Sequence, residues 1–165
     1  MDSNNNKIYD SIILGAGISG HVAAAHLRRK LSKEHEVLVV SPNSNYQWIP
    51  SNIWVGVGKM KKEQVIFPLA PIYERKGIEF HQALAQTIFP EGFGESNKPF
   101  VEITYTDPAK SGQVGRIEYD YLVNATGPKL NFAATPGLGP DGHTVSVCTA
   151  GHAVEAAASL EATIA

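Results

Sequence analysis

Three glycines near the start of the chain have a spacing that suits phosphate binding. They belong to the segment Gly15-Ala16-Gly17-Ile18-Ser19-Gly20. In this spacing the first glycine permits a tight turn, the second lets the backbone approach a pyrophosphate, and the third lets a helix pack closely on a strand. The N-terminus of such a helix directs unpaired N–H groups and a positive dipole end at the phosphates. The motif therefore predicts a dinucleotide site.

The elements around the glycines are the ones such a site needs. The apolar run Ile12-Ile13-Leu14 predicts a strand before the turn, and the stretch from His21 to Leu31 predicts a helix after it. The β-branched run 37–40 predicts the next parallel strand, reached by a right-handed crossover. Cations at 28–30 suit the negative end of that helix.

The remaining segments extend this βαβ unit. Pro71 and Gly77 suit the first turn and the end of a helix over 69–76. Strands are expected at 78–80, at 83–89 in broken form, at 100–105, at 114–119 and at 121–125, with turn-forming stretches between several of them. We therefore expect an α/β fold: a Rossmann-like FAD/NAD(P)-binding domain whose parallel sheet carries helices and a small antiparallel β-meander at about 83–119.

Composition narrows the class of protein. The chain has 165 residues and a formal net charge of −2, without a basic tract that would suit nucleic acid. Cys148 is the single cysteine, so an intrachain disulfide is excluded. No apolar run approaches the roughly 20 residues of a membrane-spanning helix. The polar start lacks the apolar segment of a signal peptide, and we expect residues 1–7 to form a disordered tail.

The partner of the ribose departs from the usual dinucleotide pattern. An acidic residue about 20 positions after the last glycine normally binds the ribose hydroxyls, but positions 37–62 contain no Asp or Glu. Ser41 stands in its place, with Asn43 close by. The same window has no Arg, and no Lys before Lys59, to hold a 2′-phosphate. FAD is favoured over NAD or NADP, since backbone contacts can hold so large a ligand.

Cys148 and His152 allow two interpretations. In the simpler one, Cys148 is a small buried thiol at a strand end and His152 a partly exposed residue of the following helix. In the other, Cys148 begins the helix that runs through 153–162, whose dipole favours a thiolate, and His152 faces the same side one turn later. One cysteine and scattered histidines do not make a structural zinc site, and no metal is expected.

Five segments in the same order resemble the amino-terminal part of sulfide:quinone oxidoreductases. They read IILGAGISG, SPNSNYQWIPSNIWVGVG, FPLAPIYERKGIEF, YDYLVNATGPKL and SVCTAGHA. These enzymes are flavoproteins with two dinucleotide-binding domains, and the first domain holds FAD. Relatives commonly carry an aliphatic residue where this chain has Asn124.

The resemblance implies a role for each group of candidate residues. Gly15, Gly17 and Gly20, with Ala16, Ile18 and Ser19 between them, face the FAD pyrophosphate. Ser41 and Asn43 lie near the adenosine ribose. The loop Pro50-Ser51-Asn52 lies close to the flavin, and the strand end Ala125-Thr126-Gly127 passes the cofactor. Cys148 becomes an accessory thiol near the flavin, which could attach to its methyl edge, with His152 beside it. The two cysteines that shuttle sulfur in the family come later in its sequences.

The same resemblance implies the organisation and function. Residues 8–128 would form an incomplete FAD-binding domain, and 129–165 a linker and the truncated start of a second nucleotide-binding domain, since the final helix has no cap or stop signal. The parent enzyme would oxidise sulfide and pass electrons through FAD to quinone. It would be a cytoplasmic protein bound peripherally to the inner membrane, and the segments that contact the membrane would lie outside this chain. This chain alone would be inactive. Two alternatives stay open: a type II NADH:quinone oxidoreductase or other FAD-dependent reductase, and a nucleotide-binding module without catalysis. The oligomeric state is left open.

Overall fold

A computed structural model describes residues 8–94, 96–139 and 141–164 of the chain. They form two compact units. The first consists of the described residues up to Ser44 together with Pro68–Gly127, and the second of Asn45–Phe67 together with the described residues from Pro128 onward. Segment 45–67 lies within the expected first domain of residues 8–128, yet it clusters with the last part of the chain. The tail expected over residues 1–7 lies outside the described residues.

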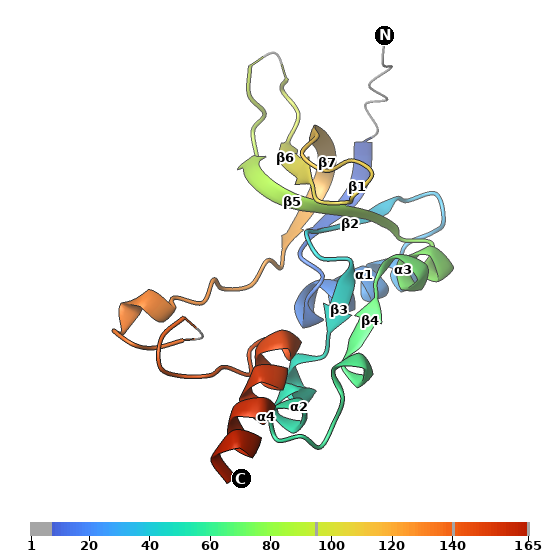
Figure 1. Cartoon of the computed structure of the whole chain (residues 1–165). Coiled ribbons are helices and arrows are strands. Elements are labelled where there is room, and N and C mark those ends of the chain that lie inside the picture. Colours follow the sequence, from blue (N-terminus) through green and yellow to red (C-terminus); the bar gives the residue numbers. More distant parts are fainter. Residues whose placement is uncertain (1–7, 95, 140, 165) are drawn as a thin grey trace. The chain divides into compact units, whose positions relative to one another are not determined.

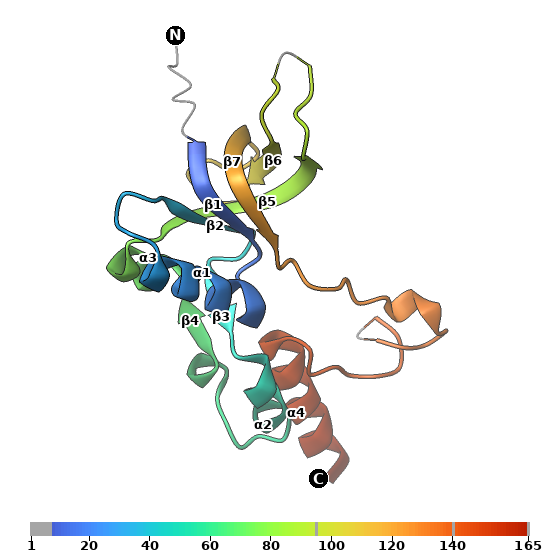
Figure 2. The same cartoon turned by 180° about the vertical axis from the view of Figure 1, so that it is seen from behind.

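The first unit is built on five strands that close into a barrel in the order β1-β2-β5-β6-β7. Their bounds are β1 Ile8–Leu14, β2 Val37–Ser41, β5 Glu79–Phe89, β6 Phe100–Tyr105 and β7 Val114–Asn124. Strand β1 lies between β2 and β7 and is parallel to both, and β2 is parallel to β5 (Figure 2). The contacts of β6 with β5 and β7 are antiparallel. The expected parallel sheet with an antiparallel meander is confirmed.

Two strands are longer than the sequence indicates, because each changes partner along its length. Residues 78–80 and 83–89 were expected as separate strands, but β5 is continuous from Glu79 to Phe89 and curves across the unit (Figure 1). Its first residues pair with β2 and its later ones with β6, with an irregular register between Ala85 and Thr87. Likewise β7 joins the strands expected at 114–119 and 121–125, and Glu118 pairs with both β6 and β1.

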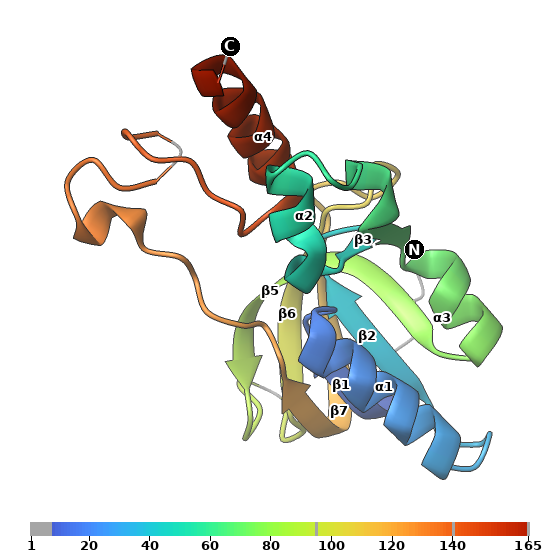
Figure 3. The same ribbon diagram turned by 90° about the horizontal axis from the view of Figure 1, so that it is seen from below.

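Two helices cover the sheet of the first unit. Helix α1, Ile18–Lys30, lies across β1 and β2 (Figure 3). Helix α3, Ala70–Lys76, contacts β5. It ends at Gly77, as expected, and Gly77 has a left-handed φ of +66°. Inside the barrel, Ile12, Leu14 and Leu38 belong to the apolar core, while Ile13 and Val39 at the alternate positions are also fully buried. Burial on both faces explains the unbroken apolar runs of these strands.

The second unit is smaller. It contains helix α2 Asn52–Gly56, helix α4 Ala150–Ile164, and β3 Asn45–Gln47 paired with β4 Ile66–Pro68. The last residue of β4, Pro68, is counted with the first unit. Three short 3₁₀ turns, η1 Ile49–Ser51, η2 Lys62–Gln64 and η3 Phe132–Ala134, complete it. Helices α2 and α4 lie side by side (Figure 1). Their apolar contact forms around Val55, Val65, Ala150 and Ala153.

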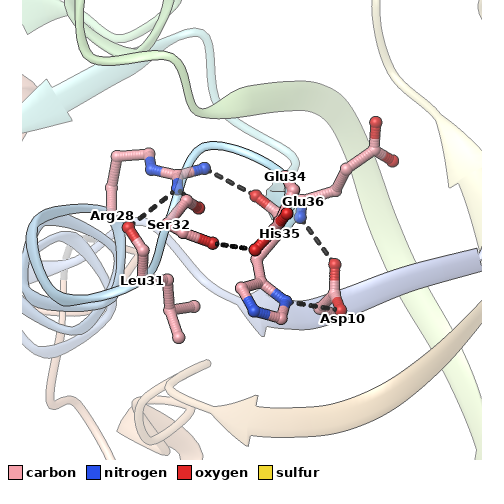
Figure 4. A network of polar contacts seen from close by, with 7 residues as sticks. All are labelled: Asp10, Arg28, Leu31, Ser32, Glu34, His35 and Glu36. Carbon is pink, nitrogen blue, oxygen red and sulfur yellow. Dashed lines mark hydrogen bonds and ion pairs between the residues drawn. The ribbon is translucent and has the colours of Figure 1, made fainter.

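A polar network fixes the turn between α1 and β2 (Figure 4). Arg28 donates to the carbonyl oxygens of Leu31, Ser32 and His35, which lie beyond the helix end. From β1, the carboxylate of Asp10 accepts from His35 Nδ1 at 2.9 Å and from the Glu36 amide at 2.7 Å. The contact with His35, followed by the one from the Glu36 amide, holds the pKa of Asp10 below its ordinary value of 3.8. This carboxylate therefore ties β1 to the start of β2.

We predict that Asp10→Asn lowers the free energy of unfolding at pH 7 by about 1 kcal/mol, because one charge-assisted acceptor is lost. A depressed folded-state pKa means that the carboxylate stabilises the fold above pH 3.8 and that this contribution is lost as the pH falls through the lower value. The variant should therefore lose less stability than the wild type on acidification. Urea unfolding at pH 7 and at acidic pH measures both effects. Asp120→Asn, at an exposed position of β7, is the control, and an equal acid dependence in wild type and Asp10→Asn would contradict the assignment.

Candidate functional site

The glycine turn lies at the carboxyl end of β1, and its first glycine cannot carry a side chain. Gly15 has a φ of +97°, and a Cβ atom there would overlap the carbonyl oxygen of Ala125. The Gly15 amide donates to Val40 O on β2 at 2.8 Å, and the Ala125 amide donates to Leu14 O at 2.8 Å. The turn is thus held between the ends of the two strands that flank β1.

Gly20 is a packing position. It is buried, and a Cβ atom there would overlap the carbonyl oxygen of Gly15 and lie 3.3 Å from the Ala125 side chain. The first turn of α1 therefore rests directly on the bend that precedes it. This is the role predicted for the third glycine.

Gly17 differs from the other two glycines, because a Cβ atom there would meet no atom of the described residues within 4 Å beyond its own chain neighbours. Gly17 is the N-cap of α1, has an ordinary φ of −70°, and makes no side-chain cap. Gly17, Ile18 and Ser19 are exposed, whereas Ala16 is buried. No acidic residue stands in the first turn to neutralise the helix dipole. Open space before unpaired amides is what a pyrophosphate requires, so the residues of this turn fit the expected cofactor.

His21 anchors the same helix turn without adding charge to it. Its Nδ1 lies 3.3 Å from the hydroxyl of Tyr73, a fully buried residue of α3. Burial, followed by the positive charge of Lys76, holds the pKa of His21 below its ordinary value. The imidazole is therefore neutral at pH 7. An anion at this turn would be held by backbone amides.

The predicted ribose residues lie at the carboxyl end of β2, next to the glycine turn. Ser41 is the last residue of β2 and is 4% exposed. Its Oγ accepts from the Asn43 amide at 3.4 Å, while Asn43 itself is exposed. The structure thus brings Ser41 and Asn43 together with Gly15–Gly20 and with Ala125 in the first unit. Thr126 and Gly127 follow Ala125, and both are exposed.

The other predicted residues belong to the second unit. Pro50 and Ser51 form η1, and Asn52 begins α2. Asn52 is completely buried, and its Nδ2 donates to Val147 O at 3.1 Å. Its Oδ1 has no hydrogen-bond partner within the described ranges of the chain. This amide thus ties α2 to the segment that carries Cys148. The sequence motif did not reveal this contact.

Two expectations for Cys148 are wrong. The thiol is free and exposed, so it is not a buried residue at a strand end. Nor does it begin the last helix: α4 starts at Ala150, and Thr149 is its cap, with Oγ1 accepting from the His152 amide at 3.1 Å. A threonine hydroxyl at this position satisfies a free helix amide, which a thiol does poorly. His152 is partly exposed as expected, but its Nδ1 is buried and has no hydrogen-bond partner in the part of the chain that the structure describes.

Gln47 is a polar contact that sequence reasoning missed. Its Oε1 accepts from the Ala150 amide at 3.2 Å and so joins β3 to the start of α4. A residue 103 positions away leaves no local signal of this contact. In the part of the chain that the structure describes, no group of three or more His, Cys, Asp or Glu residues lies together as a metal site would require. Nor is any helix among these residues both long and apolar enough to cross a membrane.

Comparison with known proteins confirms the resemblance found in the sequence. Residues 9–163 match the family described as pyridine nucleotide-disulphide oxidoreductase. A sulfide-quinone reductase of Aquifex aeolicus (strain VF5) is 33% identical over 150 residues. The crystal structure of the sulfide:quinone oxidoreductase from Aquifex aeolicus superposes with a TM-score of 0.76 at 29% identity, over 94% of this chain and 32% of that one.

A second group of relatives acts on a different electron donor. The mitochondrial external alternative NAD(P)H-ubiquinone oxidoreductase B4 of Arabidopsis thaliana is 28% identical over 144 residues, which cover 84% of this chain and 23% of that protein. The Aquifex match covers 91% of this chain and 31% of that protein. The chain therefore spans less than a third of the length of these two relatives.

We predict that Gly17→Ala and Gly20→Ala separate binding from folding. Alanine at 17 has room and an allowed φ, so the thermal stability should stay near that of the wild type, while its methyl group enters the space before the amides and weakens FAD binding by about tenfold or more. Alanine at 20 overlaps backbone and should destabilise the fold by about 2 kcal/mol. Thermal unfolding and FAD titration measure the two effects. If Gly17→Ala bound FAD as tightly as the wild type, this turn would not be the pyrophosphate site.

Proposed function

The chain belongs to the pyridine nucleotide-disulphide oxidoreductase family, and from this membership we propose that it forms the amino-terminal FAD-binding part of an enzyme that oxidises sulfide and passes the electrons to a quinone. The family consists of FAD-binding flavoproteins with oxidoreductase activity. The single observation that carries the assignment to this chain is the glycine turn, where open space at Gly17 adjoins the amides of α1.

FAD supplies the two-electron chemistry when it is bound. The residues of this chain bind and orient it. The amides of the first turn of α1 hold the pyrophosphate, and Ser41 and Asn43 serve the adenosine ribose as neutral hydrogen-bonding groups. Ala125-Thr126-Gly127 borders the cofactor on the other side of the turn. Pro50, Ser51 and Asn52 serve the flavin end.

Cys148 and His152 are the residues of this chain proposed to act near the reacting atoms. Cys148 has a free, exposed thiol, and none of the residues that the structure describes forms a hydrogen bond with His152 Nδ1. Because the Cys148 thiol is exposed, it is accessible to a bound ligand. Both residues are proposed as accessory groups, and no sulfide:quinone turnover is expected from the 165-residue chain alone.

The electron donor distinguishes the leading function from its alternative. The identity of 33% to the Aquifex sulfide-quinone reductase supports sulfide. The similarity to the Arabidopsis NAD(P)H-ubiquinone oxidoreductase supports the second candidate, an NADH:quinone oxidoreductase of the same architecture. Both relatives are named as enzymes that act on a quinone. For the parent enzyme we propose peripheral attachment to the cytoplasmic face of the inner membrane, through segments outside this chain.

The proposal predicts a flavin spectrum and a preferred donor. The purified chain mixed with FAD and freed of excess cofactor should retain the visible absorption bands of oxidised flavin. In a longer protein that contains this chain, sulfide should bleach those bands and NADH should not. Bleaching by NADH alone would favour the second candidate. A chain that retains no flavin would refute the cofactor assignment for this segment.

We also predict that FAD protects Cys148. Alkylation of its thiol by iodoacetamide should be rapid in the apoprotein and slower by about tenfold or more when FAD is present far above its dissociation constant. Mass spectrometry of the tryptic peptide gives the rate, and Cys148→Ser confirms the site. Intact mass after denaturation tests covalent attachment of the flavin, which retained flavin would support. Equal alkylation rates with and without FAD would place the thiol away from the cofactor.

A further inference from the structure

Asn124 lies in the first unit, at the point where the chain leaves the sheet after β7. It is the last residue of β7 and pairs with Leu14, the last residue of β1. Directly after it, the Ala125 amide makes one more bond to Leu14 O, at 2.8 Å. From there the chain turns away, and Gly127 has a left-handed φ of +73°.

The side chain of Asn124 holds this turn by two hydrogen bonds to one residue. Its Oδ1 accepts from the Thr126 amide at 3.3 Å and from Thr126 Oγ1 at 2.9 Å. A side-chain oxygen that binds the amide two residues on makes a local turn of the kind that asparagine favours. An aliphatic side chain at this position would leave both donors of Thr126 to solvent.

The turn held in this way lies directly against the glycine motif. A Cβ atom at Gly15 would lie 3.0 Å from Thr126 Cα, and a Cβ atom at Gly20 would lie 3.3 Å from the Ala125 side chain. The backbone of residues 125–126 therefore forms one wall of the phosphate-binding turn. The position of Thr126 therefore borders the space beside Gly15.

The hydrogen bond from Thr126 Oγ1 to Asn124 Oδ1 also determines whether the Thr126 hydroxyl can donate to a ligand or only accept from it. A hydroxyl group has one proton to donate and two lone pairs that accept. Thr126 Oγ1 donates its proton to Asn124 Oδ1, so only acceptor capacity remains. The hydroxyl can then serve a ligand hydroxyl or N–H group, but it cannot donate to a phosphate oxygen.

We propose that Asn124 is a positioning residue for FAD: it fixes Thr126 against the glycine turn and orients the Thr126 hydroxyl as an acceptor for a hydroxyl or N–H group of the cofactor. The pyrophosphate is left to the amides of α1. This inference rests on the proposed FAD-binding function. Asn124 acts through Thr126, so the two residues should behave as one unit when the cofactor binds.

A double-mutant cycle of the whole chain tests this coupling. Asn124→Leu keeps the shape of the side chain and removes the acceptor, and Thr126→Val removes the hydroxyl. Each should weaken FAD binding by about fivefold, the typical worth of one hydrogen bond, and the double variant should bind no worse than the weaker single variant. Thr126→Ser should bind like the wild type. Asn131→Leu is the matched control, since Asn131 is exposed and makes no side-chain cap to η3.

Amide hydrogen exchange of the apoprotein supplies a readout that does not depend on FAD. Exchange at Thr126 should speed up in Asn124→Leu but remain slow in Thr126→Val and in Asn124→Asp, which keep the oxygen that binds this amide. Thermal unfolding should change little, because both side chains are exposed.

The outcomes separate the inference from the proposed function. If the wild type binds FAD and Asn124→Leu binds it equally tightly, the role of Asn124 is wrong and the proposed function stands. The same holds if the losses of affinity in the two single variants multiply in the double variant. A wild-type chain that binds no FAD would refute the proposed function and the inference with it.

Discussion

In the first unit, backbone packs directly on backbone at the carboxyl ends of β7, β1 and β2. The rest of this unit depends on that contact. Side chains are excluded at Gly15 by the Ala125 carbonyl and at Gly20 by the Gly15 carbonyl. Because three strand ends and a helix start converge without intervening side chains, the unpaired amides of α1 open directly beside the sheet. The site is therefore a consequence of how the sheet ends, and no separate loop is needed to build it.

This convergence requires that β1 be held on both sides, and the two long strands provide that support. Strand β7 passes from β6 to β1 at Glu118, which pairs with both, and β5 reaches β6 only after pairing with β2. The meander thus closes the sheet into a barrel instead of adding a flap at its edge. At the opposite end of β1, Asp10 binds His35 and Glu36 and keeps β2 in register. Both ends of the βαβ unit are consequently fixed by short contacts.

Features that depend on residues close together in the sequence could be predicted from the sequence. The glycine spacing predicted the turn because Gly15 and Gly20 leave no room for a side chain, and the positions of Pro71 and Gly77 predicted α3. The bounds expected for β6 are those observed. The continuity of β5 and β7 could not be predicted, since a change of partner leaves the same extended backbone and no turn residue marks it. The sequence did not distinguish Thr149 from the adjacent Cys148 as the start of α4, because the capping hydrogen bond to the His152 amide is seen only in the folded structure. Asn124 was noted only as a departure from relatives, since its bonds to Thr126 are visible only once the strand end is known.

The charge pattern explains why the packing at the turn must be so close. No charged side chain stands between Gly15 and Gly20, the cations of α1 gather in its last turn, and His21 is neutral. At about 1.5 Å per residue those cations lie about 15 to 18 Å along α1 from its first residue, beyond a Debye length at physiological ionic strength. Binding of an anion then relies on amide hydrogen bonds and the helix dipole, which act within the first turn. Such short-range forces tolerate little displacement. The close packing of residues 125–126 against Gly15 and Gly20 fixes the start of α1, which is what the proposed binding of a charged ligand by neutral amides would require.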